Sequence, residues 1–261
     1  MLTRAQAKLI RKLKSRKPRE RSARFLVEGV RLFSELTASE HEVDLVVTAP
    51  CLTERPRGRE LLERIRRGGW PHTTVSDAEL RRLADTETPQ GVLAIARRPP
   101  WELQAFDPAA GAAVLVFDGL ADPGNLGTLL RTAYGLGVAW AVALPGTVDP
   151  WNPKAVRASA GSVFHLPVSQ EPWPDVLAWL RGRRFEILCA DPVGEPIRRG
   201  ESRAGGFALV LGSEAEGLSE EVSRVCSRRV AVGMRKGMGS LNVAVAGALL
   251  LDRLLAGSGR E

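Results

Sequence analysis

The sequence predicts two α/β units: a small one in the N-terminal part of the chain and a larger one, with a Rossmann-like parallel sheet, in the C-terminal part. Short apolar runs of strand length alternate with helix-like stretches along most of the chain. A proline-rich stretch without periodicity interrupts this alternation near residue 100. The later apolar runs are nearly continuous, as in strands covered on both faces. We therefore assign residues 1–100 to the N-terminal domain, 101–111 to a linker and 112–261 to the larger domain.

The N-terminal unit begins with a basic helix, after which strand-like and helix-like runs follow one another. Four short runs rich in β-branched or aromatic residues are typical of strands, at 25–27, 43–48, 73–75 and 91–96. Between them, apolar residues recur at helical spacing at 30–39, 57–67 and 77–83. This pattern predicts a small α/β domain.

The larger unit shows the same alternation more strongly. Apolar runs predict strands at 113–118, 138–144, 185–190, 207–211 and 229–232. Helices are predicted between them, at 126–135, 153–160, 175–181 and 220–226. The last helix, 241–255, is apolar on nearly all sides and is expected to be buried. A parallel sheet with helices on both faces binds its ligand at the carboxyl ends of its strands.

The charge of the chain is concentrated at its N-terminal end. The formal net charge is +7, and residues 1–24 hold ten basic residues against one acidic, so this block carries +9 and the rest −2. Such a block indicates a polyanionic partner. Nucleic acid is favoured over a membrane because only Leu9, Ile10 and Leu13 form an apolar stripe. The alternative is a merely solvated basic helix. The candidate RNA-contacting residues are Arg4, Lys8, Arg11, Lys12, Lys14, Arg16 and Lys17.

Several classes of protein are excluded by composition and by missing motifs. The chain is 44% hydrophobic and 26% charged, as in globular proteins, and no run approaches the roughly 20 apolar residues of a membrane span. We therefore expect a cytoplasmic protein without a membrane partner. No GxGxxG fingerprint with its acidic partner, Walker loop, GxSxG elbow or HExxH sequence occurs.

The cysteines and histidines give no indication of a metal site. The three cysteines are far apart and lack CxxC spacing: Cys51, Cys189 and Cys226. The three histidines are also scattered: His41, His72 and His165. His165 lies in SVFHLPV, which reads as packing in a strand. We expect no metal and no catalytic histidine.

Three polar, glycine-containing segments follow predicted strands, and the first is FDGLADPGNLGTLLRTA. Asp118 ends the strand, Pro123 and Gly124 form a turn, and Asn125 begins a helix that carries Arg131. Six residues at about 100° each place these two side chains about 120° apart around the helix. They do not share a stripe, but both can reach one extended substrate. The alternative makes Asn125 an N-cap and Arg131 a solvent residue.

The second and third segments are GSEAEGLS and VAVGMRKGMGSLNV. In the second, two glycines let the backbone turn sharply and present Glu214, whose carboxylate suits hydroxyl or ammonium groups rather than phosphate. In the third, Ser240 and Asn242 stand at the start of the last helix, where backbone N–H groups are free to face a ligand. Taken singly, each segment is also explained as a turn or a helix cap.

Together, the three segments resemble the SpoU/TrmH family of S-adenosylmethionine-dependent RNA ribose 2′-O-methyltransferases, of the SPOUT class. The family motifs stand here as NLGTLLR at 125–131, GSEAEGLS at 212–219 and SLNV at 240–243, in the family order. EGVRLF at 28–33 and TPQGVLAIA at 88–96 resemble the N-terminal substrate-binding domain of the family.

This resemblance implies a deep trefoil knot, a homodimer that completes the site, and S-adenosylmethionine as cofactor without a metal. It implies that the cofactor is held by Leu211, Gly212, Val232, Met234, Ser240 and Leu241. The implied catalytic or supporting residues are Asn125, Arg131, Glu214, Ser240 and Asn242. Gly233 departs from the pattern, because family members commonly carry proline before the methionine.

The implied reaction is attack of a ribose 2′-hydroxyl on the sulfonium methyl group. A guanidinium rarely accepts a proton, so we expect Arg131 to fix and polarise the substrate through a neighbouring phosphate. The first choice of substrate is 23S-type ribosomal RNA, with transfer RNA as the alternative. A non-catalytic RNA-binding or ribosome-assembly protein of the same fold is a second hypothesis. A nucleotide-binding or other small-molecule α/β enzyme is a third.

Overall fold

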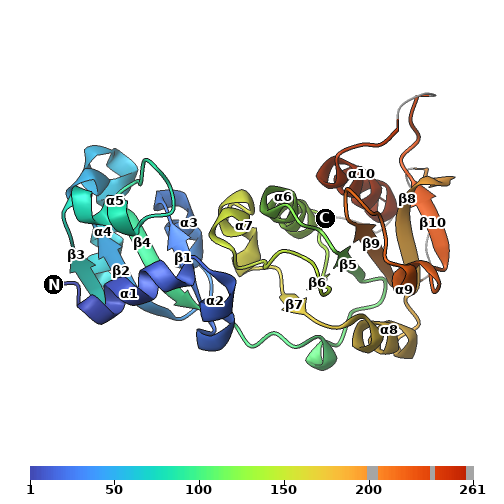
Figure 1. Ribbon diagram of the computed structural model, residues 1–261, viewed down its shortest axis with the longest axis horizontal. Coiled ribbons are helices and arrows are strands. Elements are labelled where there is room, and N and C mark those ends of the chain that lie inside the picture. The colour runs from blue at the N-terminus through green and yellow to red at the C-terminus, as the bar shows by residue number, and fades with distance from the viewer. Residues whose placement is uncertain (199–204, 236–238, 257–261) are drawn as a thin grey trace. The chain divides into compact units, whose positions relative to one another are not determined.

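The computed structural model describes residues 1–261 except 199–204, 236–238 and 257–261. The chain forms two compact units, and the α/β prediction is confirmed for both. The N-terminal unit comprises Met1–Pro100 and Trp151–Phe164, and the C-terminal unit comprises Trp101–Pro150 and His165–Glu261. Figure 1 shows the helices and strands of each unit.

The N-terminal unit is built on a four-stranded sheet of order β1-β4-β2-β3. Strand β4 is antiparallel to β1 and β2, whereas β2 and β3 are parallel. The strands are β1 (Arg24–Glu28), β2 (Val43–Thr48), β3 (His72–Thr74) and β4 (Val92–Arg97). The helices that follow the basic N-terminus are α3 (Val30–Leu36), α4 (Pro56–Arg67) and α5 (Asp77–Leu83), with a 3₁₀ turn η1 (Pro50–Glu54). The predicted ranges 43–48 and 77–83 match to the residue.

The basic N-terminus forms two helices rather than one, α1 (Arg4–Leu13) and α2 (Arg16–Ser22). Thr3 begins α1 with a capping box, in which its hydroxyl accepts from the Gln6 N–H and the Gln6 side chain accepts from the Thr3 N–H. Ile10 and Leu13 are fully buried in the core of the unit. Helix α1 is therefore part of the domain and not an appended arm.

The C-terminal unit is built on a six-stranded parallel sheet of order β10-β8-β9-β5-β6-β7. Its strands are β5 (Ala113–Asp118), β6 (Trp140–Ala143), β7 (Val168–Gln170), β8 (Glu186–Pro196), β9 (Phe207–Gly212) and β10 (Arg228–Ala231). Its helices are α6 (Pro123–Gly135), α8 (Trp173–Gly182), α9 (Glu220–Ser223) and α10 (Val243–Leu255). Strand β7 was not predicted, and β8 continues past its expected end at residue 190.

Two segments pack differently from the expectation. The stretch 101–111, expected to be a linker, packs on the C-terminal unit: Leu103 in the 3₁₀ turn η2 (Leu103–Ala105) is fully buried, and the Phe106 ring stacks on Trp140 at 4.8 Å. Apolar side chains in a proline-rich stretch explain this packing.

Residues 151–164, expected in the larger domain, pack within the N-terminal unit instead. They contain α7 (Pro153–Ala158) and the 3₁₀ turn η3 (Ser162–Phe164). The Trp151 ring lies 4.5 Å from the Phe25 ring of β1, between centroids, and Arg157 forms an ion pair with Asp85 at 2.8 Å. The prediction that His165 packs in a strand is wrong, because it lies between η3 and β7, half-buried, with its ring stacked on Tyr134.

Helix α10 lies close to α6 and β9 because Gly247 has no side chain. A Cβ at this position would lie 2.6 Å from Leu129 Cδ2 and 2.7 Å from Leu211 Cδ1. The expectation that α10 is buried on nearly all sides is wrong, since Val245 is 48% and Leu249 39% exposed. No helix within the described part of the chain is long and apolar enough to span a membrane.

Candidate active site

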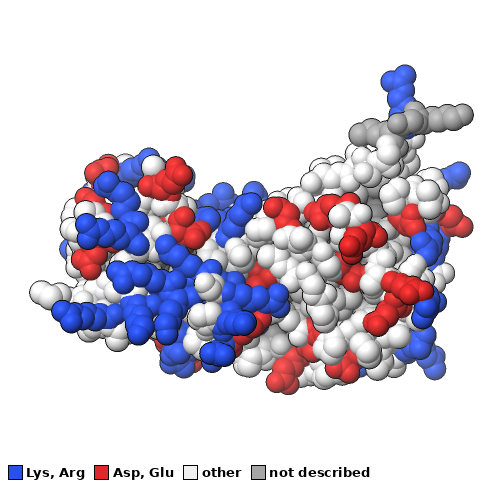
Figure 2. Space-filling model, viewed as in Figure 1, with Lys and Arg blue, Asp and Glu red and all other residues white. Residues whose placement is uncertain are grey.

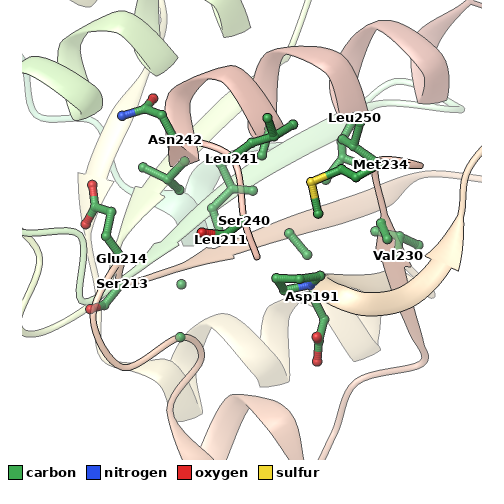
Figure 3. Close-up of a pocket in the computed structure, with 18 of the residues that line it drawn as sticks. Asp191, Leu211, Ser213, Glu214, Val230, Met234, Ser240, Leu241, Asn242 and Leu250 are labelled. Carbon is green, nitrogen blue, oxygen red and sulfur yellow. The ribbon is translucent and has the colours of Figure 1, made fainter. Parts of the chain in front are cut away.

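A cavity of about 550 Å³ lies at the carboxyl ends of β9 and β10 and beside residues 190–192 in the middle of β8. The strands are parallel neighbours, and β8 stops pairing with β9 after Cys189, just before the residues that line the cavity. The walls come from this middle part of β8, the turn after β9 and the segment between β10 and α10, as Figure 3 shows. The lining includes all six residues expected to bind the cofactor, namely Leu211, Gly212, Val232, Met234, Ser240 and Leu241.

The turn after β9 is held tightly by its own backbone. Ser213 and Gly217 exchange two N–H···O=C hydrogen bonds of 2.9 Å. A Cβ at Gly212 would lie 2.4 Å from the carbonyl carbon of Gly217, so only glycine fits there. The turn is anchored at its far end by Asp118, a buried residue whose carboxylate accepts from the Ser219 N–H at 2.6 Å. Glu214 is thus presented from a rigid turn at the cavity.

Helix α6 begins at Pro123, ahead of Asn125 and of the predicted range 126–135. Asp122 is its N-cap, and the carboxylate accepts from the Asn125 N–H at 2.8 Å, with Pro123 in the first turn. The alternative that made Asn125 the cap is therefore wrong. The Asn125 side chain is not the N-cap of α6 and contacts other segments instead.

The Asn125 amide joins the three polar segments. Its Nδ2 donates to Glu214 Oε1 at 2.5 Å, and its Oδ1 accepts from Asn242 Nδ2 at 3.1 Å. Asn242 is in turn fixed as the N-cap of α10, where its Oδ1 accepts from the Ala244 and Val245 N–H groups at 3.0 and 3.3 Å. Figure 3 shows Asn242 and Glu214 at the same end of the cavity.

The expected catalytic residues are not all at the cavity. Glu214, Ser240 and Asn242 line it, and Asn125 reaches it through its hydrogen bonds. Arg131 is exposed on α6 and is not among the lining residues. The 120° offset between positions 125 and 131 accounts for this separation. Residues 236–238 of the glycine and methionine loop lie outside the described residues.

Asp191 was missed by the sequence analysis, although it lines the cavity. It directly follows the predicted strand 185–190, so the criterion of a polar residue after a strand would have found it. Its carboxylate accepts from the Val193 N–H at 3.0 Å and is paired with the Arg229 guanidinium of β10. The Val193 N–H has the largest effect on the pKa of this carboxyl, and together with Arg229 it holds that pKa below its ordinary value against the opposing effect of burial.

Metal ligands are not gathered in the part of the chain that the structure describes. No group of three or more histidine, cysteine, aspartate or glutamate side chains is placed there to hold an ion. Cys189 is buried and Cys51 and Cys226 are partly buried; none of them forms a disulfide.

Comparisons with known proteins cover both units. Residues 4–94 match the model of the MRM3-like substrate binding domain. The chain is 31% identical over 245 residues to the Bacillus subtilis protein named 23S rRNA (guanosine(2553)-2′-O)-methyltransferase RlmP, covering 94% of this chain and 93% of that one. It is 29% identical over 247 residues to the Streptomyces viridochromogenes 23S rRNA (uridine(2479)-2′-O)-methyltransferase, covering 92% and 85%.

Solved structures agree with these similarities. The SpoU methyltransferase AviRb from Streptomyces viridochromogenes, solved with the cofactor AdoMet, superposes with a TM-score of 0.88 at 27% identity, covering 99% of this chain and 100% of that one. The model of the SpoU rRNA Methylase family matches residues 112–252. This match spans more than half of the 261 residues, and the chain belongs to the SpoU rRNA methylase family.

Proposed function

We propose that this protein transfers a methyl group from S-adenosylmethionine to a ribose 2′-hydroxyl of 23S-type ribosomal RNA. The main support for this proposal is the pair of hydrogen bonds made by the Asn125 amide at the cavity. Its partners are Glu214, which is 89 residues away in the sequence, and Asn242, which is 117 residues away. The two relatives named as 23S rRNA 2′-O-methyltransferases support the same reaction and the same class of substrate.

The cavity suits the cofactor in size and chemistry. Its volume, about 550 Å³, falls in the range of small-molecule sites. Apolar side chains such as Leu211, Leu241 and Leu250 suit an adenine ring, and the carboxylate of Glu214 suits a cationic ligand. The AdoMet bound to the related AviRb structure supports this assignment. When bound, this cofactor supplies an electrophilic methyl group on a positively charged sulfur.

The polar residues act by positioning. Ser240 and Asn242 shape the cofactor wall, while Asn125 and Glu214 hold the ribose and its hydroxyl for in-line attack. Arg131 contacts the neighbouring phosphate, whose oxygen helps to take the hydroxyl proton, because a guanidinium is a poor base.

A homodimer explains the position of Arg131. The residue lies three positions from Tyr134 on α6, on the same side of the helix, and Tyr134 is 47% exposed. Helix α10, which packs against α6, exposes Val245 and Leu249. Exposed apolar side chains on two adjacent helices are typical of a subunit interface. We infer that Arg131 serves the cavity of the partner subunit.

RNA binds to α1 and α2 in this proposal. Figure 2 shows Lys and Arg side chains gathered over these helices. Two of the expected contacts are engaged within the protein instead: Lys14 Nζ donates to the Ala84 carbonyl at 2.5 Å, and Arg16 pairs with Glu20 at 2.6 Å. The exposed residues that remain for phosphate contacts are Arg4, Lys8, Arg11, Lys12 and Lys17.

The test is transfer of labelled methyl from S-adenosylmethionine to unmodified ribosomal and transfer RNA pools in parallel. Alkali-resistant linkages then map 2′-O-methylation. We expect label at one position of 23S-type RNA. Label in transfer RNA alone would support the proposed reaction but show that transfer RNA, and not ribosomal RNA, is the substrate. Absence of both label and cofactor binding would favour the RNA-binding or ribosome-assembly hypothesis. The cytoplasm is the proposed site of action. The trefoil knot also stays a prediction.

A further inference from the structure

The cavity is acidic, although the chain as a whole carries a net charge of +7. Among the lining residues that the structure describes, the ionisable ones are Asp191, Glu214 and Glu216, and all three are acids. Charges of one sign in a concave site act together on a bound ligand. The cavity therefore favours a positive ligand over a neutral one of the same shape.

Asp191 is the least exposed of these acids. Its side chain is 16% exposed, whereas Glu214 and Glu216 are both exposed. The less a charge is exposed to water, the less its field is screened. The charge of Asp191 is thus the least screened by water of the three.

The partner of Asp191 is a cation at the edge of the cavity. Arg229 directly precedes Val230, a lining residue, and its guanidinium pairs with the Asp191 carboxylate. In Figure 3 this carboxylate points away from Met234 and Ser240. Asp191 therefore acts on a ligand through Arg229, whose charge it neutralises, and not by contact with the reacting methyl group.

The two ligands of the proposed reaction differ by one charge. At neutral pH, S-adenosylmethionine carries a sulfonium, an ammonium and a carboxylate, so its net charge is +1. In the reaction the ribose oxygen bonds to the methyl carbon as the sulfur–methyl bond breaks, and the bonding pair stays on sulfur. The hydroxyl proton leaves toward the phosphate or solvent. The product S-adenosylhomocysteine therefore lacks the sulfonium charge and is neutral overall.

We propose that Asp191, by neutralising Arg229, makes the cavity prefer the sulfonium cofactor over its neutral product. The inference rests on the proposed function and deepens it. Asp191 is in this sense a specificity-determining residue and not a catalytic one. Methyl transfer then lowers the affinity of the cavity for the bound ligand, which favours exchange of the product for a new molecule of cofactor.

The test measures both dissociation constants by titration calorimetry at low ionic strength. Asp191→Asn keeps the shape and an acceptor for Arg229 but removes the negative charge. We expect the Kd of S-adenosylmethionine to rise roughly tenfold and that of S-adenosylhomocysteine to rise less than about threefold. Arg229→Gln removes the positive charge and is expected to shift the preference the other way. Both shifts shrink at high salt.

A matched control lies on the same two strands. Glu195 of β8 forms an ion pair with Arg228 of β10 at 2.8 Å. Neither residue is among the described residues that line the cavity. Glu195→Gln is expected to leave both dissociation constants unchanged. Equal weakening of the two ligands by Asp191→Asn, or a shift of the same sign by Arg229→Gln, would overturn the inference. A wild-type protein that binds neither ligand would instead overturn the proposed function.

Discussion

Asn125 donates its side-chain amide to the Glu214 carboxylate at 2.5 Å across 89 residues of sequence. The two residues follow neighbouring strands, since β5 pairs with β9 up to Asp118 and Gly212. On its other side the amide oxygen accepts from Asn242. The Asn125 amide therefore uses its N–H group as a donor on one side and its oxygen as an acceptor on the other, which fixes its orientation. The Glu214 carboxylate is held in one place as a result.

Asn125→Asp is expected to impair methyl transfer while sparing the cofactor. The substitution replaces an N–H donor by a carboxylate opposite Glu214, so the two like charges repel and the Glu214 side chain moves. We expect the single-turnover rate to fall about a hundredfold, as on loss of a preorganised polar contact, with the cofactor Kd within about threefold. Glu195→Gln, at a position that does not line the cavity, is the control. A rate for Asn125→Asp close to that of the control would show that the bridge has no part in catalysis.

Replacing Lys8, Arg11 and Lys12 together by glutamine is expected to weaken RNA binding. Removing one cation that binds a phosphate reduces the slope of log K against log salt by about 0.7 to 0.9. Electrophoretic or filter binding at several salt concentrations measures this slope. Deletion of residues 1–24 would be misleading because Ile10 and Leu13 are buried.

The control for this triple variant is Lys14→Gln. Its ammonium donates to the Ala84 carbonyl, so we expect a loss of stability and an unchanged salt slope. An unchanged slope in the triple variant would remove α1 from the RNA-binding surface.

The sequence predicts elements well where the signal is local. The runs 43–48 and 113–118 are recovered to the residue, because each is a short run with several valines that is followed within two residues by a proline or glycine, where a strand ends. Strand β7 (Val168–Gln170) was missed because three residues carry too little periodicity. The packing of Leu103 and of residues 151–164 was also missed, since it depends on partners distant in sequence.

In the candidate site, too, the sequence predicts what depends on local motifs and misses what depends on contacts between distant segments. The order of the three motifs predicted which segments meet, and Glu214, Ser240 and Asn242 all line one cavity. The exposure of Arg131 depends on which face of α6 is buried by the sheet and α10, and a periodicity argument does not specify that. The Asp191–Arg229 pair depends on β8 lying beside β10, a neighbour relation that strand order along the chain does not reveal.

Asp44 is expected to give the N-terminal unit a pH-dependent stability. Its carboxylate accepts from Arg24 Nε at 2.5 Å and Arg97 Nε at 2.8 Å, joining β1, β2 and β4. Burial raises the pKa of Asp44, but the two arginines outweigh it and hold the pKa below 3.8. Because the folded-state pKa is the lower one, the stabilisation is present above the unfolded-state value and is lost as pH falls through the folded-state value.

We therefore expect Asp44→Asn to lower the free energy of unfolding by about 1 kcal/mol at pH 7, allowing for solvent screening. The difference from wild type should shrink as pH falls through the folded-state pKa of Asp44, which lies below 3.8, because protonation then makes both proteins neutral at this position. Urea unfolding at pH 7 and at a pH below that pKa measures it. Glu42→Gln is the control, because Glu42 pairs with Arg97 at 3.0 Å but is 71% exposed. A deficit of the same size at both pH values would assign the loss to packing and not to charge.

Mixing two inactive variants tests whether Arg131 serves the partner subunit. Arg131→Ala keeps its own cavity intact, and Glu214→Gln keeps its arginine. If the arginine acts across the interface, each mixed dimer contains one complete site, formed by the Arg131→Ala cavity and the partner's arginine. Random exchange makes half of the dimers mixed, so about a quarter of wild-type methyl transfer should return. If Arg131 serves its own cavity, no complete site forms and the mixture stays inactive. Leu249→Glu, placed on the exposed face of α10, should abolish both dimerisation, measured by sedimentation, and this recovery.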